Sequence, residues 1–230
     1  MNKIPNFLCL SLLLLSAIAL GMDNPQKSLV AQLWSAALSS KNINEVRRLI
    51  AKGADVNTHD AEGRPLLIEI MVVRNTKEIG EVLIDNGANI NARDHEGQTA
   101  LIVAAIFGRI DTCKMLIEKR ADINMRNNKG QTALMLAAHA NKIEVCKLLI
   151  DALVKPTKKE TDPIVKLLGI KRYKRSEQLN LQDKDVVKQL MGREAYNQLV
   201  QENKPKAEME INRIKDDKIK QDLLNYLKRI

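Results

Sequence analysis

Residues able to carry chemistry are few in this 230-residue sequence, and they form no familiar catalytic arrangement. The histidines are His59, His95 and His139, and no two of them have the spacing of metal ligands. There is no glycine-rich phosphate loop, nucleophile elbow or paired-carboxylate motif. We therefore expect that the protein is not an enzyme, that it uses no cofactor or metal ion, and that it takes no small-molecule substrate.

Two cysteines, Cys113 and Cys146, lie at matching places in two similar segments, which raises the question of a disulfide bond. Stacked helices lie about 8–10 Å apart, whereas bridged cysteines need Cα atoms within about 7 Å of each other. We therefore expect both thiols to remain reduced and buried, each acting as a small hydrophobic side chain.

The two similar segments read DHEGQTALIVAAIFGRIDTCKMLI from residue 94 and NNKGQTALMLAAHANKIEVCKLLI from residue 127. Shared residues recur with a constant spacing of 33, among them Gly97 and Gly130, and Thr99 and Thr132. A period of this length with a Gly-x-Thr-x-Leu opening resembles the ankyrin repeat, whose unit is a turn followed by two antiparallel helices. The resemblance implies an all-α fold, an ankyrin-repeat solenoid, with a C-terminal helical extension in this chain.

The residues of one unit favour the same structure. Thr99 and Thr132 each follow a turn glycine and precede an apolar run, so each can cap the start of a helix. Gly108 and Asn141 then interrupt the helices at equivalent positions, and both residue types tolerate a left-handed turn. One such hairpin cannot bury its own apolar faces, but stacked neighbours can.

The resemblance covers residues 28–152 as about four repeats. The first repeat lacks the Gly-x-Thr opening and is interpreted as an N-terminal cap, because terminal repeats face water on one side. The second carries Pro65 in place of the capping threonine. The third has Arg120 where the earlier units have Gly53 and Gly87, and a left-handed turn there costs arginine about 1 kcal/mol relative to glycine.

Residues 1–21 have the pattern of a signal peptide. Lys3 supplies the positive start, and an almost entirely apolar run follows from Phe7 to Leu20. This run is short of the roughly 20 residues that span a bilayer and suits a signal-peptide core. We expect export after cleavage before Met22, to a secreted or periplasmic location. The alternative is membrane anchoring through an uncleaved N-terminal segment.

Residues 153–230 form a basic C-terminal extension that resembles no family. Within it, residues 155–175 hold eight Lys and Arg against two acidic residues. Three interpretations stay open: a solvated linker, contact with an anionic membrane surface or acidic partner, and nucleic-acid binding. Apolar spacing predicts one helix from Val186 to Val200 and a second that starts near Pro205 and ends at Ile230. We expect these helices to cover the open face of the last repeat.

The surface left for function comprises the turn tips and the ends of the first helices. The helix-end pairs are Val72–Val73, Ile106–Phe107 and His139–Ala140, of which two are wholly apolar. A small apolar patch rimmed by charge is typical of a protein-binding surface. The alternative is burial of these pairs by the C-terminal helices or by a rotated helix. The predicted protein-binding residues are Val72, Val73, Arg93, His95, Glu96, Ile106, Phe107, Arg126, Asn128, Lys129 and His139.

We therefore expect an exported, monomeric protein–protein interaction module that binds a protein partner through the concave face and turn tips of the stack. The alternative is an electrostatic binder of an anionic membrane surface or of nucleic acid through residues 155–175. Export argues against nucleic acid as a partner. Salt distinguishes the two functions, because phosphate-driven affinity falls steeply with ionic strength.

Overall fold

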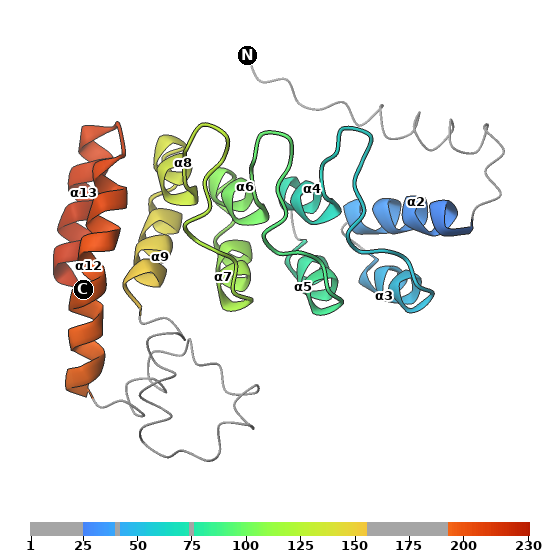
Figure 1. Ribbon diagram of the computed structural model, residues 1–230, viewed down its shortest axis with the longest axis horizontal. Helices are drawn as coiled ribbons and strands as arrows, with labels where there is room; N and C mark the ends of the chain where they lie inside the picture. The colour runs from blue at the N-terminus through green and yellow to red at the C-terminus, as the bar shows by residue number, and fades with distance from the viewer. Residues whose placement is uncertain (1–24, 40–41, 74–75, 156–192) are drawn as a thin grey trace. The chain divides into compact units, whose positions relative to one another are not determined.

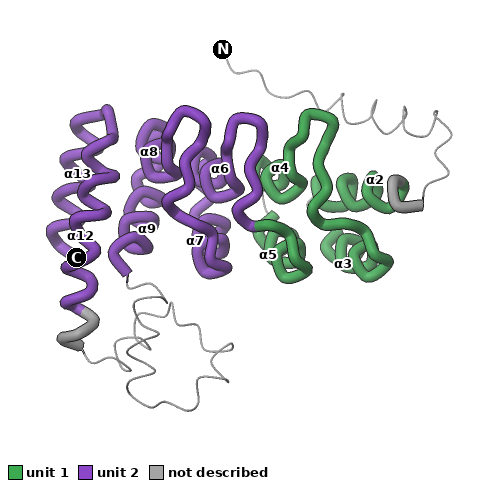
Figure 2. The backbone as a smooth tube through the Cα atoms, viewed as in Figure 1, with its two compact units in different colours: residues 1–89 green, residues 90–230 purple. Residues whose placement is uncertain are grey.

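The computed structural model describes residues 25–39, 42–73, 76–155 and 193–230 (Figure 1). Within these ranges the chain forms ten α-helices and no strand beyond an isolated bridge between His59 and Pro65. The predicted all-helical class is therefore confirmed. The chain divides into two compact units, residues 1–89 and residues 90–230, each with helical hairpins of its own (Figure 2).

The described part of the first unit contains four helices: α2 (Pro25–Leu38), α3 (Ile43–Ala51), α4 (Leu66–Val72) and α5 (Lys77–Asp85). Helix α2 pairs with α3 and α4 pairs with α5, while α2 packs on α4 and α3 on α5. One hairpin cannot bury its apolar side chains alone, so this double pairing is what gives the unit a core. Its fully buried side chains include Leu33, Ala37, Val46, Leu49, Leu66, Ile70 and Leu83.

The second unit begins with two hairpins of the same kind. They comprise α6 (Ala100–Ile106) with α7 (Ile110–Glu118), and α8 (Ala133–His139) with α9 (Ile143–Val154). The first helices pack on each other, as do the second helices. Small side chains allow the close approach, because the alanine pairs at the ends of α6 and α8 are completely buried. These pairs are Ala104–Ala105 and Ala137–Ala138.

The helix starts and turns follow the predicted local chemistry. The Thr99 hydroxyl accepts a 3.4 Å hydrogen bond from the Ile102 amide, and Thr132 caps α8 in the same way. The residue between the two helices has a positive φ in both hairpins, 67° at Gly108 and 54° at Asn141. Both predictions from the repeat pattern are therefore confirmed.

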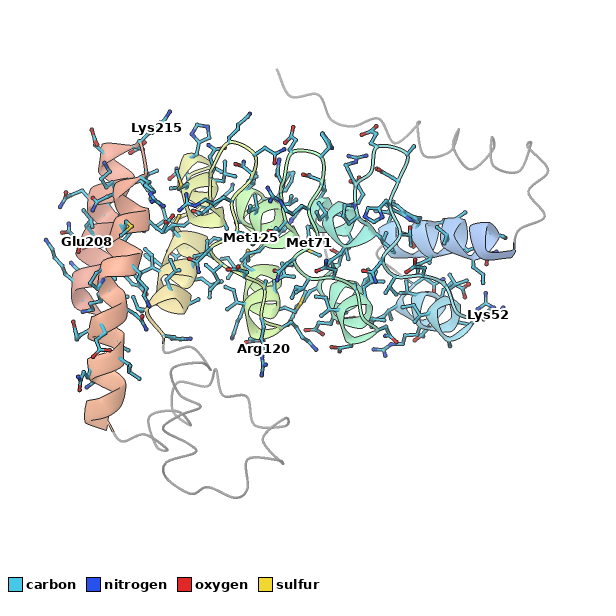
Figure 3. The ribbon with its side chains drawn as sticks, in the orientation of Figure 1. Lys52, Met71, Arg120, Met125, Glu208 and Lys215 are labelled. Atoms are coloured by element: carbon cyan, nitrogen blue, oxygen red, sulfur yellow. The ribbon has the colours of Figure 1, made fainter. Side chains whose placement is uncertain are left out.

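Arg120 takes the left-handed conformation that Gly53 and Gly87 have in the first two repeats. Its φ is 70°, and its amide donates a 2.9 Å hydrogen bond to the Ile117 carbonyl as the helix α7 ends. The side chain projects into solvent from this end of α7 (Figure 3). The third repeat therefore keeps the glycine geometry with an arginine, at a conformational cost of about 1 kcal/mol.

Two C-terminal helices complete the second unit, α12 (Arg193–Asn212) and α13 (Asp217–Arg229). The predicted helix start near Pro205 is wrong, because Pro205 lies inside α12. Buried Ala207 and Ile211 hold the chain helical beyond the proline. The break comes instead at Asp216, whose carboxylate accepts a 3.0 Å hydrogen bond from the Ile219 amide and caps α13.

These two helices cover the open side of the last repeat, as predicted. Helix α12 packs along α9 and touches α8, while α13 packs on α12 and α9 (Figure 1). The Tyr226 hydroxyl on α13 donates a 2.8 Å hydrogen bond to the Asp151 carboxylate on α9. Helix α9 is also longer than α7, 12 residues against nine, because no Gly-Ala-Asp turn ends it.

Residues 1–21 lie outside the described residues, and so does the basic run from residue 156 to residue 175. In the part of the chain that the structure describes, no helix is both long enough and apolar enough to span a membrane.

Candidate functional site

In each hairpin tip of the second unit, one side chain accepts hydrogen bonds from the backbone of its own turn. Asp94 accepts hydrogen bonds from the amides of Glu96 and Gln98, at 2.9 and 2.8 Å. Asn127 accepts the equivalent pair in the next hairpin, from Lys129 and Gln131. A short polar side chain that binds its own backbone two and four residues on gives a rigid turn. The tip side chains therefore project from a fixed backbone.

Arg93 and Asn128 join the two hairpins. The guanidinium of Arg93 donates to the Arg126 carbonyl at 3.0 Å and to Asn128 Oδ1 at 3.2 Å. Asn128 in turn donates from Nδ2 to the His95 carbonyl at 2.9 Å. Gly97 lies beneath this contact with a φ of 75°, and a Cβ there would come within 2.9 Å of the Asn128 amide nitrogen. These two predicted binding residues thus hold the tips in register.

Arg126 repeats the position of Arg93 one unit later but has a different partner. It contacts the Gly130 carbonyl at 2.8 Å, as Arg93 contacts that of Gly97. Its other arm then reaches Glu210 on α12, at 2.7 Å, because no further hairpin follows in the repeat pattern. The Thr132 hydroxyl donates to the second oxygen of Glu210 at 3.4 Å. Glu210 therefore takes the place that a fifth hairpin would occupy.

An open depression of about 340 Å³ lies between the two hairpin tips and the helices behind them. Its floor is aliphatic, formed by Ile106 at the end of α6 and Leu136 in α8. Its rim is polar and comes from the tips. The rim residues are His95, Glu96, Gln98, Asn127, Asn128, Lys129 and Gln131. An apolar floor with a polar rim is the arrangement that protein interfaces use.

Phe107 follows Ile106 as the C-cap of α6 and is 45% exposed. The Arg109 guanidinium lies 5.9 Å from the centre of its ring, within the range of a cation–π contact. The described C-terminal helices α12 and α13 therefore leave this residue exposed. Ile106 is half-buried, and His139, the equivalent of Ile106 on α8, is exposed.

Comparison with protein families decides what the hairpins are. Residues 33–127 match a pattern of three successive ankyrin repeats, and residues 129–159 match a further single ankyrin repeat. The chain is an ankyrin-repeat protein. A comparison with curated proteins finds no match.

Membership of the ankyrin-repeat family sets the broad function. Ankyrin repeats form protein–protein interaction modules, and the proteins that carry them are typically non-catalytic. In the described residues, no group of three or more histidine, cysteine, aspartate or glutamate side chains could hold a metal ion. The depression between the ankyrin hairpins is accordingly a candidate for contact with another protein.

The cysteines of the ankyrin repeats are free and buried, as predicted. Burial raises the pKa of the Cys113 and Cys146 thiols to about 12 each. The nucleophilic thiolate is therefore scarce at neutral pH, and neither side chain suits covalent chemistry.

Val72 and Val73 belong to the first unit, where both are half-buried at the end of α4. The hairpin tip of that unit is closed on itself by ion pairs. Arg64 contacts Asp60 at 2.8 Å and Glu69 at 3.3 Å. Burial raises the pKa of Glu69, and the charge of Arg64 opposes that rise.

The residues that line the depression and were not among those predicted from the ankyrin pattern are Gln98, Asn127, Gln131 and Leu136, and Glu210 beside them was not predicted either. Leu136 and Asn127 could have been found from their counterparts one repeat earlier, Val103 and Asp94. Glu210 had no such signal, because α12 is not a repeat and lies far from Arg126 in the sequence.

Proposed function

We propose that this ankyrin-repeat protein is an exported, monomeric, non-catalytic module that binds a protein partner across the third and fourth hairpins. The observation that carries the proposal is the exposure of Phe107, which directly follows Ile106 in the chain, and Ile106 lies in the floor of the depression. Phenylalanine is among the residue types most often buried, so a half-exposed ring on a rigid helix end calls for an explanation. A large aromatic side chain on such a surface is typical of a binding anchor.

The surroundings of Phe107 support the same function. The tips are stiffened by Asp94, Asn127, Arg93 and Asn128, so little conformational entropy is lost when a partner orders the surface. Lys129 and His95 stand exposed at the rim. Rim charges steer association and orientation more than they add affinity.

Site-specific photo-crosslinking tests this proposal. A photoreactive phenylalanine analogue in place of Phe107 should capture the partner in the native compartment, and the same analogue in place of Lys114 should not. Lys114 is a matched control because it is exposed on α7, away from the lining of the depression. Equal capture at both positions, or at Lys114 alone, would contradict the proposed site.

Export forms a separate part of the proposal and rests on residues 1–21. Their charged start and short apolar run have the pattern of a cleaved signal peptide. Mass spectrometry of the native N-terminus should find the chain starting at Met22. A retained Met1 would favour the anchored alternative.

A second candidate function rests on the charge of residues 155–175, with eight basic and two acidic residues. Such a run attracts an anionic membrane surface, and more remotely nucleic acid, with an affinity that falls as salt rises. Binding to vesicles with anionic lipid, measured at low and at physiological salt, tests this function separately. Binding through the depression should change less over the same range, because its floor is apolar and only its rim is charged.

A further inference from the structure

Glu96 and Lys129 occupy the same place on successive hairpins and carry opposite charges. Each is the residue before the turn glycine of its own repeat, and both are exposed at the rim of the depression. The rim therefore has an anion on one repeat and a cation on the next. A partner that crosses both hairpins meets these two charges in a fixed order.

Two glutamines repeat in the same manner and offer complementary hydrogen-bonding groups. Gln98 lines the depression, and its amide nitrogen donates to the Glu96 carboxylate, so its side-chain carbonyl oxygen remains available as an acceptor. In the next hairpin, the side-chain carbonyl oxygen of Gln131 accepts a hydrogen bond from Asn127 Nδ2 at 3.1 Å. The side-chain amide NH2 of Gln131 therefore remains available as a donor. One acceptor and one donor suit the amide and carbonyl groups of a partner backbone.

The repeat spacing selects the conformation of that backbone. Stacked helices lie about 8–10 Å apart. In a polyproline II segment, three residues complete one turn and rise about 9.3 Å, so side chains three apart point the same way at that spacing. Residues on one face of a β-strand lie about 6.6 or 13 Å apart, which does not match. The polyproline II backbone also makes no internal hydrogen bonds, so its polar groups are free to pair with the two glutamines.

We propose that the depression binds an extended, polyproline II-like segment of the partner with a basic residue over Glu96 and an acidic residue three positions away over Lys129. An aliphatic side chain between them enters the floor of Ile106 and Leu136. This inference rests on the proposed function and adds the chemistry of the segment that is bound. The opposite charges also set its direction along the hairpins.

Selection from a phage library of random dodecapeptides on the full chain tests the inference. Peptides enriched on the wild-type protein should carry Lys or Arg and Asp or Glu three positions apart, with an aliphatic residue between. A synthetic peptide of that pattern should bind about tenfold more weakly to Lys129→Glu, because an attraction becomes a repulsion. The matched reversal Lys114→Glu on α7 should leave its affinity unchanged.

A charge swap gives the sharper readout. The double variant Glu96→Lys with Lys129→Glu should bind weakly to the original peptide and recover affinity for a peptide with the two charges exchanged. Absence of enrichment, enrichment without the charge pair, or affinity that ignores both reversals would overturn the inference. If binding still falls on Phe107→Ala while it ignores the reversals, the inference fails and the proposed function stands. If peptides and native partner alike ignore Phe107→Ala, both fail.

Discussion

Arg126 on the last hairpin donates a 2.7 Å hydrogen bond to Glu210 on α12, in the direction in which Arg93 reaches the following hairpin. Each of these arginines contacts a carbonyl of its own turn, and its Nη2 has a further acceptor beyond its own repeat. Helix α12 supplies one and so ends the stack with a side chain instead of another repeat. The C-terminal extension is thus fitted to the hairpins that line the proposed site.

Replacement of Glu210 should weaken the contact between α12 and the last hairpin. Glu210→Ala removes the acceptor for Arg126, Arg213 and Thr132, and the Glu210 side chain is only 12% exposed. Because both arginines are partly solvated, we expect a loss of about 1 kcal/mol in the free energy of unfolding. Urea unfolding measures it, and faster amide exchange in α12 should accompany it. Glu208→Ala, on the exposed side of α12 (Figure 3), should change neither quantity.

The strain at Arg120 predicts a stabilising substitution. Arg120→Gly removes the cost of the left-handed backbone, but it also makes the unfolded chain more flexible. The net gain should be about 0.5–1 kcal/mol in thermal or urea unfolding. Lys119→Gly is the control, since φ is −81° there and glycine should destabilise. A loss at Arg120→Gly equal to that at Lys119→Gly would show that the left-handed turn carries no strain.

The two repeat cysteines should react only when the protein unfolds. Burial raises the pKa of each thiol to about 12, so at neutral pH both are protonated as well as inaccessible. Iodoacetamide without reductant should modify Cys113 and Cys146 fully in denaturant and hardly at all in buffer, as read by peptide mass spectrometry. A peptide pair joined through these cysteines would contradict the reduced state.

Tyr226 should make the stability of the protein depend on pH in the alkaline range. Burial, and then the Asp151 carboxylate, raise the pKa of Tyr226 to about 12. An unfolded tyrosine ionises near pH 10, so the contribution is complete below about pH 10 and is lost as the pH rises to about 12. Tyr226→Phe should flatten this part of the stability curve. If the stability curves of the wild type and of Tyr226→Phe were identical above about pH 10, the pKa of Tyr226 would not be raised in the folded protein.

Much of the fold could be predicted because the repeat encodes it locally. Thr99 and Thr132 cap their helices, and Gly108 and Asn141 turn the chain, through contacts within a few residues of each position. The predicted helix start near Pro205 was wrong because proline is only a local signal for a helix start. The packing of buried Ile211 against the rest of the unit keeps α12 continuous.

The candidate site was less accessible from sequence. Arg93 and Arg126 were expected to orient a partner, but their guanidinium groups bind the next hairpin and Glu210. A residue that recurs in each repeat can contact either the neighbouring repeat or a partner protein, and the sequence alone does not distinguish these two roles. Among the cationic side chains of the tips, Lys129 on the rim is therefore a better candidate for contact with a partner than Arg93 or Arg126.

The central prediction concerns Phe107. An aromatic anchor truncated to alanine typically costs at least about 2 kcal/mol in binding, which is a roughly thirtyfold loss of affinity. A tip charge should cost less, about 0.5–1 kcal/mol, and mostly through the association rate. Because Phe107 is already 45% exposed, removal of its ring should hardly affect folding.

The most direct test is to measure, for Phe107→Ala and Lys129→Ala, the dissociation constant for the native partner and the melting temperature. We predict that Phe107→Ala weakens binding at least about thirtyfold, that Lys129→Ala weakens it about two- to fivefold, and that neither moves the melting temperature by more than about a degree. A melting temperature several degrees lower for Phe107→Ala, with affinity intact, would contradict the proposed site and show that Phe107 serves the fold.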